Sequence, residues 1–124
     1  MSTGTLLLDA ALVAAGAAIG AVVRLLLGWV WVRVLPAGFP WAIWAVNMAG
    51  SFVAGVLAGT SDSTVFLLAA IGFCGSLTTM SAFAFDTVTL AQERLPRLAW
   101  SNVIGSVIPG IVLAAVGMWW GGAI

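Results

Sequence analysis

The residues best suited to chemistry lie in a polar stretch, Gly72–Thr87, which reads GFCGSLTTMSAFAFDT and stands between apolar runs. Gly is a weak helix former, and Ser and Thr compete for backbone hydrogen bonds, so a helix through GSLTT is poorly supported. A break there would expose carbonyl groups that can hold a cation and N–H groups that can face an anion. Phe83 and Phe85 add ring edges, which carry partial positive charge.

Two pairs of polar side chains lie in other apolar segments. Asn47 and Ser51 are four residues apart, so they share one face of a helix, and Asn102 and Ser106 repeat this spacing. Each amide offers two N–H donors and each hydroxyl offers one. The side chains could line a polar pathway, or they could simply bond to a neighbouring helix.

Arg24 lies inside the first apolar segment, in GAAIGAVVRLLLG. Its guanidinium is always charged, so the side chain either extends to the membrane interface or lines an aqueous vestibule. In a vestibule it attracts anions. Hydrogen-bond donors, aromatic edges and an arginine together favour a small anion over a cation as the transported species.

The composition excludes a water-soluble domain. Of 124 residues, 63% are hydrophobic and 6% are charged, whereas soluble domains carry about 25% charged residues. The chain has no His and one Cys, Cys74, so a disulfide within the chain and a cysteine-rich metal site are excluded. No nucleophile stands with a base, and no basic patch is available for nucleic acid. The sequence predicts an integral membrane protein of the lipid bilayer that is not an enzyme.

Four segments are long enough for the roughly 20 apolar residues that a membrane-spanning helix needs. They cover about residues 5–34, 39–59, 64–91 and 96–120, with short connectors between them. The polar stretch lies within the third segment, which is therefore predicted to be broken. The prediction is an all-α protein with one four-helix transmembrane domain over residues 1–124.

Small residues and a proline predict how these helices pack. Glycine pairs at four-residue spacing let helix backbones approach closely, and three such pairs occur: Gly16 and Gly20, Gly55 and Gly59, Gly117 and Gly121. Pro109 has no N–H, so it frees the carbonyl of Gly105 and predicts a kink in the fourth helix. Polar residues within the spans must face something other than lipid, which predicts an oligomer.

The arginines near the connectors predict an orientation. Arg33 lies by the first connector, and Arg94 and Arg97 lie by the third, which four spans place on the same side. The positive-inside rule then puts both termini outside. Three charges are a weak bias, so insertion in both orientations remains open.

With these motifs together, the chain resembles the CrcB/Fluc family of bacterial fluoride channels over essentially its whole length. The motifs follow the family's order: GAAIGAVVR, VNMAGSFVAG, GFCGSLTTMSAF and NVIGSVIPG. The third motif is the most specific, because a G-S-L-T-T run inside a membrane span is rare.

The resemblance implies a dual-topology channel in the cell inner (plasma) membrane. Two chains would pack antiparallel, with two narrow fluoride pores at their interface and passive export of cytoplasmic fluoride. The resemblance also implies a structural sodium ion at the dimer centre, held by the backbone carbonyls of Gly75 and Thr78. It makes Asn47 a pore residue and places Arg24 near a vestibule.

The family lines its pores with two Phe residues spaced three apart. The second corresponds to Phe83, but the first falls on Met80, whose thioether offers no ring edge. By resemblance Ser81 is a pore-lining hydroxyl, and Asn102 and Ser106 are what remains of the polar track in the fourth span.

Met80 leaves two possibilities open. The chain could be a homodimeric channel that tolerates Met, or one member of a heterodimer with a paralogous chain, which the one-sided arginines favour. It could also be a non-conducting or half-active subunit of such a heterodimer, which Met80 favours. A proton-coupled exporter of the small multidrug type is a further alternative. It needs a carboxylate deep in the first helix, and the candidate, Asp9, lies close to the start of the span.

Overall fold

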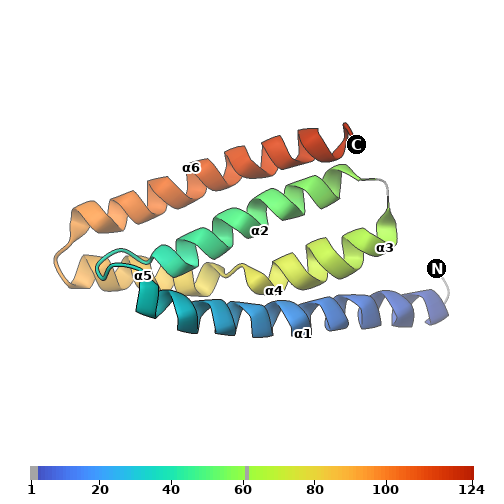
Figure 1. Cartoon of the computed structure of the whole chain (residues 1–124), viewed down its shortest axis with the longest axis horizontal. Helices are drawn as coiled ribbons and strands as arrows, with labels where there is room; N and C mark the ends of the chain where they lie inside the picture. Colours follow the sequence, from blue (N-terminus) through green and yellow to red (C-terminus); the bar gives the residue numbers. More distant parts are fainter. Residues whose placement is uncertain (1–2, 61) are drawn as a thin grey trace.

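The structure is a computed structural model that describes residues 3–60 and 62–124, and these residues form a bundle of long helices (Figure 1). The elements are α1 (Thr3–Val34), α2 (Trp41–Gly59), α3 (Ser63–Val65), the π-helix η1 (Phe66–Cys74), α4 (Gly75–Leu77), α5 (Met80–Gln92) and α6 (Pro96–Gly121).

Among the described residues, four helical segments are long and apolar enough to cross a membrane: Thr3–Val34, Trp41–Gly59, Ser63–Gln92 and Pro96–Gly121. The prediction of an all-helical protein with four such helices is confirmed. Many large apolar side chains remain exposed on the single chain, among them Leu25, Val32, Ile111 and Trp119. This surface suits contact with lipid or with another apolar chain.

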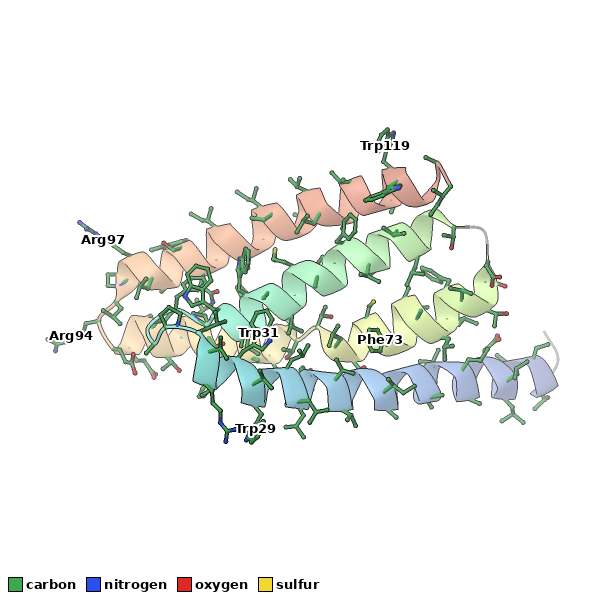
Figure 2. All side chains as sticks on the ribbon, viewed as in Figure 1. Trp29, Trp31, Phe73, Arg94, Arg97 and Trp119 are labelled. Atoms are coloured by element: carbon green, nitrogen blue, oxygen red, sulfur yellow. The ribbon has the colours of Figure 1, made fainter. Side chains whose placement is uncertain are left out.

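The helices run roughly along one axis, and both ends of the described chain lie toward the same end of the bundle (Figure 1). The α1–α2 and α5–α6 connectors lie at the opposite end. Arg94 and Arg97 point away from the bundle there, whereas Trp119 lies near the other end (Figure 2). The Arg33 guanidinium stacks 3.6 Å from the centre of the Trp29 ring, an arrangement suited to a membrane interface.

Glycines allow close backbone contacts between two pairs of helical elements. A Cβ added at Gly16 would overlap the Leu68 carbonyl of η1, so α1 and η1 touch through their backbones. In the same way, a Cβ at Gly55 of α2 would overlap the Ala114 carbonyl of α6. These contacts confirm that the glycine pairs are packing faces, and α2 packs more extensively against α6 than against any other element.

The carbonyl that Pro109 frees is used by a tryptophan. Trp44 of α2 donates a hydrogen bond of 2.8 Å from its indole Nε1 to the Gly105 carbonyl of α6. An unpaired carbonyl in an apolar setting is costly, and this bond satisfies it within α6, which runs from Pro96 to Gly121. The bond also fixes α2 against α6 beside the candidate site.

Candidate functional site

Two extended residues separate α4 from α5. Thr78 has φ −76° and ψ 156°, and Thr79 has φ −149° and ψ 118°. On the α4 side, both the N–H and the hydroxyl of Thr78 donate to the Cys74 carbonyl, at 3.0 and 2.9 Å. On the α5 side, the Thr79 hydroxyl oxygen accepts from the Ala82 N–H at 3.2 Å and caps the new helix.

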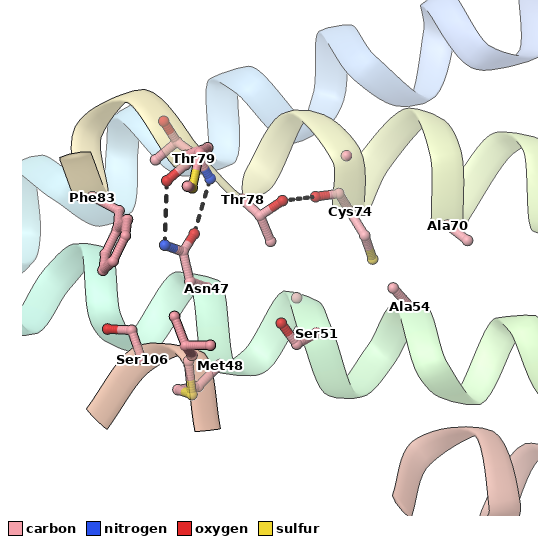
Figure 3. Close-up of a pocket in the computed structure, with 14 residues that line it drawn as sticks. Asn47, Met48, Ser51, Ala54, Ala70, Cys74, Thr78, Thr79, Phe83 and Ser106 are labelled. Atoms are coloured by element: carbon pink, nitrogen blue, oxygen red, sulfur yellow. Dashed lines mark hydrogen bonds between the residues drawn. The ribbon is translucent and has the colours of Figure 1, made fainter. Parts of the chain in front are cut away.

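Asn47 of α2 reaches across to this segment with both ends of its amide (Figure 3). Its Oδ1 accepts from the Thr79 N–H at 2.9 Å. Its Nδ2 donates to the Thr79 carbonyl at 3.3 Å. The side chain therefore pairs with the Thr79 backbone as a neighbouring strand would.

These bonds change the partners of two carbonyl groups. In a continuous α-helix the Thr79 N–H would donate to the Gly75 carbonyl, and the Ala82 N–H would donate to the Thr78 carbonyl. Here the first N–H bonds to Asn47 and the second to the Thr79 hydroxyl. The Thr78 carbonyl accepts instead from Arg24 Nη1 at 3.4 Å. Both carbonyls thus lose their helical donors and become available to other groups.

A cavity of about 380 Å³ lies beside the break, between α2, the third helical segment and α6. The side chains that line it are uncharged and mostly apolar, with a few hydrogen-bonding groups among them (Figure 3). The structure brings together at this cavity six of the residues predicted from the sequence: Asn47, Gly75, Thr78, Met80, Phe83 and Ser106. Ser51, predicted to share a face with Asn47, lines it as well.

Three predicted site residues do not line this cavity. Arg24 contacts the break from the α1 side, through the Thr78 carbonyl. Ser81 is exposed, and its hydroxyl lies 3.1 Å from the Thr79 hydroxyl. The side chain of Asn102 is buried within the helix bundle and is only 2% exposed.

Asn102 is the centre of a buried hydrogen-bond chain between α5 and α6. Its Nδ2 donates to Thr87 Oγ1 at 2.9 Å, and its Oδ1 accepts from the Ser106 hydroxyl at 3.3 Å. Thr87 Oγ1 in turn donates to the Phe83 carbonyl at 2.8 Å. This series of hydrogen bonds therefore links Ser106 and Phe83, two residues that line the cavity.

Sequence reasoning missed Thr79 and Thr87 as site residues. Thr87 follows Phe83 by four residues, the spacing at which a Thr hydroxyl bonds back to a helical carbonyl, and this signal could have identified it. The role of Thr79 depends on a partner 32 residues away along the chain, which no local pattern reveals.

Exposure differs along the start of α5. Met80 is 75% exposed and Phe85 is 71% exposed, whereas Phe83 is half-buried beside Asn47. The site thus combines amide and hydroxyl donors with one aromatic ring. Met80 lies at the side of the cavity that is open to the surroundings. Hydrogen-bond donors in such an uncharged, mostly apolar cavity can replace part of the hydration shell of a small anion.

Comparison with known proteins bears on this site. Residues 11–118 match the family described as CrcB-like protein, Camphor Resistance (CrcB). A protein from Thermobifida fusca (strain YX), named Fluoride-specific ion channel FluC 1, is 39% identical over 112 residues, which cover 90% of this chain and 93% of that protein.

Two further relatives carry the name Fluoride-specific ion channel FluC. The one from Thermus thermophilus is 38% identical over 119 residues, covering 91% of this chain and 93% of the relative. The one from Leptospira interrogans is 36% identical over 115 residues, covering 87% of this chain and 90% of the relative. Both the family match and the relatives span the break and the cavity, and the chain belongs to the CrcB family.

Proposed function

We propose that this chain forms a fluoride-selective passive channel that exports cytoplasmic fluoride and so gives fluoride resistance. The observation that carries the proposal is the agreement between relatives named as fluoride channels and the uncharged donor cavity at the helix break. Fluoride efflux from liposomes that contain only this chain tests it directly.

Selectivity follows from the size and hydration of the ion. Fluoride is small and strongly hydrated, so a pore must replace its water with donors. Asn47 and Ser51 offer such donors around the cavity, and the Phe83 ring adds a positive edge. Chloride is larger and does not fit a path narrow enough for these donors to surround fluoride.

Two chains form the channel by packing antiparallel in the cell inner membrane. The cavity of one chain is open on the side where Met80 and Gly75 are exposed, and a second chain closes it there. The exposed apolar side chains of the long helices supply the remaining contact surface. A two-fold arrangement then creates two equivalent pores.

A structural sodium ion fits the carbonyl groups at the break. Unwound backbone carbonyls at half-helix ends are a common way to hold sodium in membrane proteins, and the carbonyls of Gly75 and Thr78 have lost their helical donors. The Thr78 oxygen accepts from Arg24, and its second lone pair remains for a cation. Bound sodium would supply a positive charge that attracts the carbonyl groups at the breaks of both chains.

Met80 supports a second candidate, in which this chain is one half of a heterodimer. Position 80 carries a thioether where the resemblance implies an aromatic ring, so a partner chain would supply the complete aromatic pair. The small multidrug exporter is not supported, because the cavity lining includes no carboxylate and Asp9 lies near the start of α1.

A further inference from the structure

The N–H of Thr79, at the break in the third helix, has two possible acceptors. One is the Gly75 carbonyl, its partner in a continuous α-helix. The other is Asn47 Oδ1, which holds it at 2.9 Å. The second bond, from Asn47 Nδ2 to the Thr79 carbonyl at 3.3 Å, secures the same residue from the other side.

No residue of the local chain rules out the helical alternative, although Ser and Thr weaken it. Neither Thr78 nor Thr79 is a proline, so both N–H groups can make helical bonds. Thr78 does so, because its N–H donates to the Cys74 carbonyl at 3.0 Å. The cap that Thr79 places on Ala82 starts α5, but it leaves the N–H of Thr79 itself free to return to Gly75. The acceptor that this N–H uses instead lies on α2.

We propose that Asn47 is a positioning residue of the cation site as well as a donor in the pore. By taking the Thr79 N–H, Asn47 keeps the Gly75 carbonyl open for sodium. The proposal rests on the sodium site of the proposed function and adds the residue that maintains it.

The same two bonds orient the amide toward the anion. Because the Thr79 N–H can only donate, the Asn47 oxygen must face it, and the amide nitrogen must take the other position. One of its two N–H groups donates to the Thr79 carbonyl, which leaves one on a side chain that lines the cavity. A single side chain thus couples the cation site to the anion pathway.

The test is the sodium dependence of thermal unfolding, measured on the detergent-purified full chain in sodium chloride and in N-methyl-D-glucamine chloride. For the wild type we expect an unfolding temperature that rises with sodium and saturates. In N47A the Thr79 N–H returns to Gly75, so the apparent sodium affinity falls about tenfold, as expected for the loss of one hydrogen bond.

Two variants keep the test specific. N47D retains an oxygen that accepts the Thr79 N–H, so its sodium response is kept or strengthened while fluoride efflux is lost. N102A is the matched control, because it also removes an asparagine amide with two hydrogen bonds but leaves the break untouched. Its sodium response should equal that of the wild type.

A full sodium response in N47A overturns the proposal, and so does a lost response in folded N47D. If N47A does not fold, a sodium response stronger than that of the wild type in N47D supports the proposal, and a lost response overturns it. A wild-type protein without any sodium response would also remove the sodium site from the proposed function. Fluoride efflux from the same preparation then shows separately whether the channel function stands.

Discussion

Each side chain around the break makes a different hydrogen bond, and the residue types alone do not predict which one. Thr78 closes α4, Thr79 starts α5, and Asn47 holds the peptide between them. Arg24 places a permanent positive charge 3.4 Å from the Thr78 carbonyl. In the proposed channel that charge would attract anions toward the break, and it would also limit how tightly a second cation binds the same oxygen.

Met80 is the residue at which a single substitution should improve the channel. Met80→Phe adds a ring edge beside the cavity that Phe83 already lines, and an aromatic edge contributes about 1 kcal/mol. We therefore expect fluoride efflux to rise a few-fold, measured with a fluoride electrode on liposomes. Phe85→Met is the control, because Phe85 is 71% exposed and does not line the cavity. Unchanged efflux in Met80→Phe would place residue 80 outside the pore.

The residues at the cavity were largely predictable, but their bonds were not. Residue types and four-residue spacing predicted that Asn47 and Ser51 share a face and identified the polar stretch of the third segment, because both are local features of the sequence. The pairing of Asn47 with Thr79 and of Asn102 with Thr87 joins different helices. Such contacts depend on how the helices pack, which a single sequence does not specify.

Among the elements, α2 and α6 depend on the bond between an indole and a proline-freed carbonyl. Trp44→Phe removes the donor to Gly105, and a buried carbonyl left unpaired costs about 1–3 kcal/mol. We expect this loss in the free energy of unfolding, measured by denaturant titration in detergent.

Pro109→Ala provides the matching rescue. An alanine at position 109 has an N–H that can reach the Gly105 carbonyl, so the double variant should recover most of the loss. Equal losses in the Trp44→Phe variant with and without Pro109→Ala would show that the two residues are not coupled.

The contact between α1 and η1 predicts opposite effects for two glycines of the same helix. Gly16→Ala forces a Cβ onto the Leu68 carbonyl, and overpacking of this kind costs about 1–3 kcal/mol. A Cβ at Gly28 meets no atom within 4 Å, so Gly28→Ala should be neutral or stabilise by up to about 1 kcal/mol. Thermal unfolding compares the two, and equal effects would contradict the close contact.

The lengths of the helices were predictable, but the π-helical form of η1 was not. Hydrophobic runs and polar connectors predict where a membrane helix begins and ends, and the four long helices follow them. An α-helix and a π-helix differ by one residue in their hydrogen-bond spacing, which no composition signals. In η1, Gly72 lies against Val13 and Gly16 of α1, so packing against another helix accompanies this form.

At the scale of the whole molecule, one chain forms only part of the wall of each proposed pore, and a second chain must supply the rest. The cavity is open where Met80 is exposed, and the long helices present large apolar surfaces. Arg94 and Arg97 lie at the end opposite Trp119 (Figure 2), and this asymmetry favours one orientation of the single chain. Two equivalent pores in a homodimer require both orientations, whereas a heterodimer requires one from each chain.

Fluoride efflux from liposomes that contain only this purified chain tests the central claim most directly. Liposomes loaded with potassium fluoride and potassium chloride receive valinomycin, and electrodes follow the release of both anions. We predict rapid fluoride release without chloride loss, and no fluoride release through Asn47→Asp. Equal release of fluoride and chloride, or no fluoride release from protein shown to be folded and dimeric, would contradict a self-sufficient fluoride-selective channel.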